Sequence, residues 1–204
     1  GNIADHYSIT GVPTGANTVN GFVETWYDQS GNGNNAVQAT AASQPKVVDT
    51  GALLADGIDF DGTDDFLATT NAISSTNIAI IAVCKQPSTA AEAIFSALQN
   101  FNDGHEIQYR AVTNGIRYAL EDSDLDISGT TANKNVFFAN YDGSVQTFAV
   151  NGVASTQSTS KTVSTITRLA QIGSRMGQDF LDGSIQEIIV YLSDQTANRT
   201  AIET

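Results

Sequence analysis

Charged residues, cysteine, proline and histidine are all scarce in this sequence of 204 residues. Charged residues make up 15% of the chain, against about a quarter in an ordinary soluble domain. Thr, Ser, Asn and Gln are therefore expected to cover the surface. The single cysteine, Cys84, excludes an intramolecular disulfide framework and a Cys-based zinc site. No apolar run approaches the roughly 20 residues of a membrane-spanning helix, so we expect no membrane insertion.

Positive charge is the scarcer sign. The chain has 9 Lys and Arg against 22 Asp and Glu, which gives a formal net charge of −13. Such a surface repels phosphate backbones, so we expect no nucleic-acid partner. The chain also lacks a phosphate-binding glycine loop, a dinucleotide-binding glycine motif and the H-E-x-x-H metal motif. The sequence therefore indicates an acidic domain and gives no sign of nucleotide binding or of that type of metalloprotease site.

What is present is a series of short runs rich in Val, Ile, Phe, Tyr and Thr, separated by Gly, Asn and Asp. Tight-turn dipeptides, Asn114-Gly115, Asp142-Gly143 and Asn151-Gly152, stand between several of them and indicate hairpins. Only residues 194–203 look helical, with Asp194 as N-cap. The pattern predicts an all-β fold of two packed antiparallel sheets, a jelly-roll sandwich with a short C-terminal helix. The predicted strands are residues 22–27, 58–60, 66–69, 78–85, 93–98, 106–112, 115–121, 135–141, 146–150, 169–173 and 184–192.

The length of the chain fits one domain, which we expect to span residues 22–204. Residues 1–21 are rich in Gly, Thr and Asn and have no clear strand, so they are expected to form an extended arm or the remnant of a longer chain. Residues 152–167 are dense in Ser and Thr and are interpreted as an outer strand followed by a loop.

A polar loop follows the first predicted strand, in the segment WYDQSGNGNN that begins at Trp26. Asn and Asp side chains bond neighbouring backbone N–H groups, so the loop can be a rigid, self-bonded turn. The alternative is a ligand or Ca²⁺ site, in which Trp26 stacks on the ligand and oxygen atoms of Asp28, Asn32 and Asn34 bind it.

Three carboxylates stand close together in the next motif, at Asp61, Asp64 and Asp65. They repel one another unless a cation or backbone donors neutralise them. The motif is therefore either a turn with solvated, capping acids or a Ca²⁺ site, and Ca²⁺ is the only cofactor we consider.

A third candidate is the pair of strands around residues 106–121. Period-2 alternation places Tyr109 with Ile107 on one face and Gln108 with Arg110 on the other, while Arg117 alternates with Tyr118. Tyr109 and Arg117 could bind a sugar, since sugars need apolar faces for the ring and polar forks for the hydroxyls. Burial in the core explains the aromatic residues equally well.

These motifs together resemble a known fold family. The segments VETWYDQSGNGNN, FDGTDDFL and LDGSIQEIIVY, which begin at Val23, Phe60 and Leu181, are similar to the laminin-G and concanavalin A-like jelly roll. WYDQSGNGN in particular resembles the catalytic jelly roll of the arabinofuranosidase B family, and also lectin-like domains of phage tail, other virion and secreted bacterial proteins. The resemblance covers most of residues 22–203.

The chain departs from the hydrolase family at both catalytic positions. The family's nucleophilic Glu would fall near Phe101, and its acid/base Asp would follow Ile172-Gly173, where Ser174 and Arg175 stand. Retaining glycoside hydrolysis needs two carboxyl groups. The resemblance therefore implies the fold without the catalytic pair, unless Asp103 or Glu106 acts together with Asp179.

We accordingly expect a non-catalytic module for carbohydrate binding, adhesion or assembly in a virion, secreted or cell-surface protein. Its expected partners are a glycan or cell-surface polysaccharide and other protein chains, in a homo-oligomer or a larger assembly, because an exposed sheet edge favours pairing. The expected location is extracellular or on a virion surface. The alternatives are a glycoside hydrolase of the arabinofuranosidase type and a purely structural virion domain.

Overall fold

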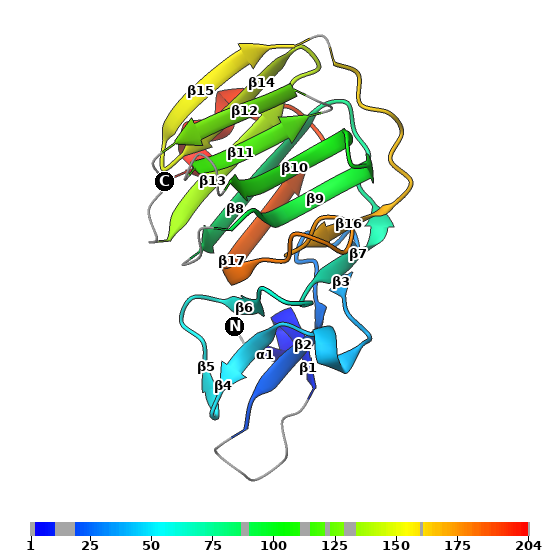
Figure 1. Ribbon diagram of the computed structural model, residues 1–204, viewed down its shortest axis with the longest axis vertical. Coiled ribbons are helices and arrows are strands. Elements are labelled where there is room, and N and C mark those ends of the chain that lie inside the picture. The colour runs from blue at the N-terminus through cyan, green and yellow to red at the C-terminus, as the bar shows by residue number, and fades with distance from the viewer. Residues whose placement is uncertain are drawn as a thin grey trace.

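The computed structural model describes residues 3–10, 19–86, 90–110, 115–120, 123–128, 134–159 and 161–203. Strands dominate it, and they form two facing layers joined by a smaller group of strands near the N-terminus (Figure 1). The predicted two-sheet antiparallel sandwich is thereby confirmed. None of the helices in the described ranges has the length and apolar character needed to cross a membrane.

One layer, called here the back sheet, has five antiparallel strands paired in the order given next. They are β15 (Val153–Ser158), β14 (Val145–Val150), β13 (Asn135–Tyr141), β8 (Ile78–Lys85) and β17 (Asp182–Tyr191). Almost every residue of β8 is buried, because this strand is apolar on both faces. β8 and β13 both have the predicted bounds.

The other layer, the front sheet, carries the candidate site and is also antiparallel. Its strands, in order of pairing, are β12 (Ser123–Ser128), β11 (Gly115–Leu120), β10 (Asp103–Arg110), β9 (Glu92–Asn100), β16 (Leu169–Ile172) and β7 (Leu67–Ala72). The predicted hairpin of β10 and β11 is confirmed by the pairing of Arg110 with Gly115. Its turn residue Asn114 lies outside the described residues.

Short strands link the two sheets at one end (Figure 1). β3 pairs with β7 of the front sheet, and β6 pairs with β17 of the back sheet. These strands are β1 (Tyr7–Thr10), β2 (Gly21–Trp26), β3 (Ala36–Val37), β4 (Lys46–Asp49), β5 (Ala52–Leu53) and β6 (Ile58–Asp61). β1 pairs with β2 and follows the short helix α1 (Ile3–His6). The expectation that residues 1–21 contain no strand is therefore corrected.

Aromatic rings fill the space between the two sheets. Tyr109 of the front sheet meets Phe137 of the back sheet edge-on, with ring centroids 5.8 Å apart. Tyr118 lies 6.1 Å from Phe148, which itself stacks on Phe137 at 6.3 Å. All four side chains are at most 3% exposed, and aromatic pairs of this geometry contribute beyond their buried area. This contact ties the sheets into one core.

The outer face of the back sheet is covered by the C-terminal segment. Ile202 of α2 (Arg199–Ile202) packs on a small second cluster that includes Ile81 and Phe138. A 3-10 turn, η2 (Thr196–Asn198), precedes this helix, and its N-cap is Gln195 rather than the predicted Asp194. Asp194 stands one residue earlier and accepts a hydrogen bond from Thr196 N at 2.9 Å. The predicted short C-terminal helix is confirmed. The outer face of the front sheet has no such helix in the described residues, and its polar side chains define the candidate site.

Candidate functional site

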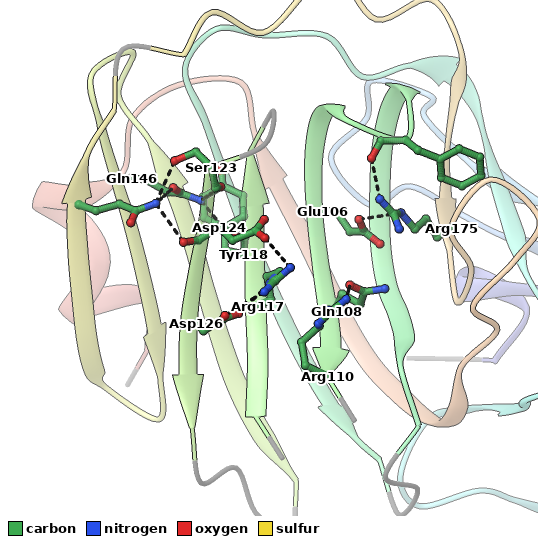
Figure 2. Close-up of polar contacts among 12 residues, drawn as sticks. Glu106, Gln108, Arg110, Arg117, Tyr118, Ser123, Asp124, Asp126, Gln146 and Arg175 are labelled. Atoms are coloured by element: carbon green, nitrogen blue, oxygen red, sulfur yellow. Dashed lines mark hydrogen bonds and ion pairs between the residues drawn. The ribbon is translucent and has the colours of Figure 1, made fainter. Parts of the chain in front are cut away.

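Alternation along β10 and β11 separates core residues from polar ones. Ile107, Tyr109 and Tyr118 point into the sandwich, and the side chains between them lie on the outer face. Gln108 and Arg117 are direct cross-strand partners there. We call the resulting group the polar face, and Figure 2 labels all of its members except Asp179. Its members are Glu106, Gln108, Arg110, Arg117, Asp124, Asp126, Arg175 and Asp179.

Glu106 is the most unusual member of the polar face because its carboxyl group is buried, with 1% of the residue exposed. Its Oε2 lies 3.1 Å from Arg175 Nε, close enough for an ion pair although the N–H is not aligned for a hydrogen bond. Its Oε1 is buried and has no partner among the described residues. Burial raises the pKa of Glu106 to about 7, since the attraction of Arg175 only partly offsets it and Asp179 adds repulsion.

Arg175 and Asp179 reach Glu106 from a tight loop between β16 and β17. Residues 175–178 close a turn in which Arg175 N donates to Gln178 O at 2.7 Å and Gln178 N donates to Arg175 O at 2.9 Å. Two non-glycine residues of the loop have left-handed backbones, Met176 at φ 52° and Asp179 at φ 49°. Such conformations are unfavourable for side-chain-bearing residues and persist only where the surroundings impose them.

The guanidinium group of Arg175 has a partner on each side. Its Nη2 donates to the carbonyl of Phe101 at 2.6 Å, and its Nη1 lies 3.8 Å from Asp179 Oδ2. The guanidinium carbon stands 5.1 Å from the centroid of the Phe101 ring, in cation–π range. Phe101 is 42% exposed, so an aromatic ring borders the polar face.

Arg117 is held by the neighbouring strand β12. It donates to Asp126 with two nitrogens, Nε at 2.7 Å and Nη2 at 2.9 Å, and Nη1 pairs with Asp124. The hydrogen bonds from Arg117 hold the pKa of Asp126 below its usual value. Beside it, Arg110 Nη1 donates to Gln108 Oε1 at 3.0 Å. Arg117 thus lies on the polar face, on the side of the strand that alternation indicates. Its guanidinium nitrogens are all paired with the carboxylates of Asp124 and Asp126.

Two predicted aromatic contacts lie elsewhere. Tyr109 is 3% exposed, and its hydroxyl faces Cys84 Sγ at 4.0 Å inside the core. Trp26 is half-buried against the core and packs on Tyr7 with ring centroids 6.1 Å apart. Burial of Tyr109 removes it from any ligand surface. Asp103, an alternative catalytic carboxylate, accepts a bond from Ser164 N at 3.1 Å and makes no described contact with Arg175.

The loop after β2 is bonded mainly to itself. Asp28 accepts hydrogen bonds from Ser30 N at 2.8 Å and from Asn34 N at 3.0 Å. Burial alone would raise the pKa of Asp28, but these hydrogen bonds outweigh it and hold the pKa below its usual value. Asn32 Nδ2 donates to Ser30 Oγ at 2.9 Å, and Asn34 Oδ1 accepts a bond from Asn71 at 2.9 Å. The geometry matches the rigid-turn alternative.

The three acids at the end of β6 and in the turn that follows it converge, with one carboxylate oxygen of each lying within 4.8 Å of the others. Asp61 Oδ1 accepts a bond from Thr63 N, Asp64 Oδ2 from Ser43 Oγ, and Asp65 Oδ2 from Asp61 N. Burial, with the charges of Asp61 and Asp64, raises the pKa of Asp65 to about 7. Each acid keeps a second oxygen without a described donor, so the cluster fits a hard cation that takes oxygen ligands.

The sequence alone pointed to part of the polar face. Alternation placed Gln108 and Arg110 on the outer face, and Glu106 with Asp179 was considered as a substitute catalytic pair. Phe101 and Arg175 entered only as positions where a catalytic carboxylate was missing. Their role depends on the bent backbone of the loop, for which Gly173 and Gly177, both at positive φ, were the available signal.

Comparisons with solved structures identify the fold. A heptameric SAP-like pentraxin from Limulus polyphemus aligns with a TM-score of 0.56 and 13% identity, covering 70% of this chain and 78% of that one. The mouse laminin alpha1 chain, domains LG4-5, aligns with a TM-score of 0.51 and 14% identity, over 69% of this chain and 43% of that one. Trypanosoma rangeli sialidase in complex with sialic acid aligns with a TM-score of 0.62 and 12% identity, over 91% of this chain but only 31% of the sialidase.

These likenesses confirm the predicted concanavalin A-like, laminin-G-like jelly roll, and at such low identity they show the fold alone. No protein-family model matches the sequence, and the search of curated proteins returns no match.

Proposed function

We propose that this protein is a carbohydrate-binding jelly-roll module, and that the glycan binds at the polar face beside Phe101. The observation that carries the proposal is the buried, incompletely bonded carboxyl of Glu106 next to an exposed aromatic ring. Sugar-binding sites combine polar groups for the hydroxyls with a flat apolar surface for the ring. Both components are present within the reach of one residue, Arg175.

The experiment is a glycan-array screen with the wild-type protein and two variants. Phe101→Ala removes the aromatic surface and is expected to abolish or strongly weaken binding. Tyr191→Ala is the matched control, since Tyr191 has a similar exposure, 38% against 42%, but lies in β17 of the back sheet. Equal loss in both variants, or no binding by the wild type to any glycan, would contradict the proposal.

A second candidate function, glycoside hydrolysis, is favoured by one specific observation. Glu106 has a pKa raised to about 7, as a general acid needs, and Asp179 is joined to it through Arg175. The test is turnover of a panel of aryl glycosides by the wild type and by Glu106→Gln. Turnover that disappears in the variant would establish hydrolysis, whereas glycan binding without turnover leaves the module non-catalytic.

Calcium binding at Asp61, Asp64 and Asp65 is proposed as a separate property of this protein.

We also propose a location outside the cell or on a virion, which the acidic, hydroxyl-rich composition supports. Assembly with other chains is proposed because the similar pentraxin is heptameric. Ultracentrifugation tests assembly, and a monomer at every concentration would contradict it. We also propose that the loop with Trp26, Asp28, Asn32 and Asn34 forms the rim of a ligand site. The alternative, a purely structural domain, would bind no glycan.

A further inference from the structure

We infer that the polar face selects uncharged sugars over sugars that carry a carboxylate. The ligand would offer hydroxyl groups to the carboxylates of Glu106 and Asp179 and lay an apolar C–H surface on Phe101. This inference rests on the proposed function and names the class of its ligand.

The first argument is that the forks of two of the three arginines, Arg117 and Arg175, are already occupied. A ligand carboxylate is best bound by a free guanidinium, whose N–H groups match it in pairs. Both forks of Arg117 are closed by Asp124 and Asp126. The terminal nitrogens of Arg175 face Phe101 O and Asp179. At Arg117 or Arg175, an acidic sugar would have to displace a protein carboxylate or carbonyl before it gained a partner of its own.

The second argument is the charge of the polar face. As defined above it contains four carboxylates, Glu106, Asp124, Asp126 and Asp179, and three guanidinium groups, Arg110, Arg117 and Arg175. Arg110 donates a hydrogen bond to the amide oxygen of Gln108, and its charge also attracts the carboxylates of Glu106 and Asp126. The whole chain carries −13. With Glu106 about half-protonated near pH 7, because its pKa is raised to about 7, these local charges nearly cancel and offer no net attraction to an anion. The field of the whole chain disfavours an incoming anion.

The third argument is that, within the ion pairs of the polar face, the more accessible partners are acceptors. The side chains of Asp124, Asp126 and Asp179 are 37%, 37% and 35% exposed, whereas Arg117 and Arg175 are only 19% and 23% exposed. Carboxylates accept hydrogen bonds, and sugar hydroxyls can donate them.

Glu106 adds a buried acceptor below this surface. Its Oε1 is buried without a described donor, and an unsatisfied buried polar atom is costly. Arg175 covers it, but its Nε is not aligned for a hydrogen bond with Glu106. A ligand hydroxyl that shifts Arg175 slightly would supply the missing donor.

The experiment compares two ligands that differ only in their carboxyl groups. An acidic polysaccharide and its carboxyl-reduced, neutral form are titrated into the wild-type protein by calorimetry at low and high salt, alongside the best neutral glycan from the array. We expect the neutral form to bind at least about tenfold more tightly, a difference that corresponds to 1.4 kcal/mol, with little dependence on salt. Phe101→Ala should weaken this binding and Tyr191→Ala should not.

Two outcomes would overturn the inference. Tighter binding of the acidic form, weakened by salt and by Arg110→Gln, would show that the face selects anions, while leaving glycan binding itself intact. Failure of the array and of every titrated ligand would remove the proposed function together with the inference. Thermal melting of each variant shows whether a loss of binding comes from a loss of folding. Glu106→Gln, which keeps the shape of the side chain, tests in addition whether the Glu106 carboxylate accepts a hydrogen bond from the ligand.

Discussion

At the residue scale, the most informative groups are two carboxyl groups whose pKa is raised by burial. Glu106 and Asp65 are 1% and 6% exposed, and burial raises the pKa of each to about 7. They differ in their surroundings, because Glu106 faces Arg175 whereas Asp65 lies in a cluster with two other acids. Each situation leads to a distinct solution test.

Glu106 should make the protein less stable as the pH rises. Its pKa in the folded protein, about 7, lies above the ordinary value of 4.5. Its stabilising contribution is therefore fully present below about pH 4.5 and is lost as the pH rises through about 7. Glu106→Gln removes this loss, so the variant should match the wild type near pH 4.5 and exceed its unfolding free energy by about 1–3 kcal/mol at pH 8.

Urea denaturation across the pH range measures the difference. Asp65 has a shift of the same sign, but it is present in both proteins and cancels in the comparison. A variant that is less stable than the wild type at pH 8 would mean that the ion pair with Arg175 outweighs burial.

Calcium should stabilise the protein through the acid cluster. A cation bound by Asp61, Asp64 and Asp65 would relieve their repulsion and displace the proton that Asp65 holds near neutral pH. At a calcium concentration about 100 times the dissociation constant the gain is about 2.7 kcal/mol, which raises the melting temperature by several degrees. Calorimetry with calcium, magnesium and chelator makes the comparison. An effect that persists in Asp61→Asn/Asp64→Asn would place the ion elsewhere.

At the element scale, the loop between β16 and β17 decides where Arg175 and Asp179 stand. Gly173 and Gly177 both have positive φ, 81° and 78°, but they differ in their surroundings. A Cβ at Gly173 would lie 2.4 Å from the ring of Phe60, whereas at Gly177 nothing lies within 4 Å. The pair therefore separates backbone strain from a steric clash within one loop.

Gly177→Ala should cost about 1 kcal/mol, from the left-handed backbone alone. Gly173→Ala should cost about 2–4 kcal/mol, because the ring of Phe60 must also move in a packed core. Chemical denaturation gives both values. Equal losses would show that the core around Phe60 yields easily, and Gly173→Ala should also weaken glycan binding because it shifts Arg175.

Sequence patterns predicted the long, apolar elements and missed the short, polar ones. β8 and β13 have their predicted bounds, since continuous apolar runs between turns leave little choice. β1, β3, β4 and β5 were not predicted, because two to four residues carry no periodicity and depend on partners distant in sequence. β12, which carries Asp124 and Asp126, was also missed, because most of its residues are polar and only one is buried. The sequence predicted only part of the polar face. Strand alternation indicated the position of Arg117, whereas the contact of Arg175 with Glu106 depends on a loop conformation that no local pattern encodes.

At the scale of the whole molecule, continuous strand pairing and a shared aromatic core predict a single cooperative unfolding transition. Phe148 contacts Tyr118 of the opposite sheet and Phe137 of its own. Trp26, the only tryptophan, lies in β2 among the strands that link the sheets. Phe148→Ala should cost about 3–5 kcal/mol. If the molecule is one unit, the fluorescence of Trp26 and the far-ultraviolet circular dichroism should shift to the same new midpoint. A Trp26 transition that stays in place while the dichroism shifts would show instead that the linking strands unfold independently of the sandwich.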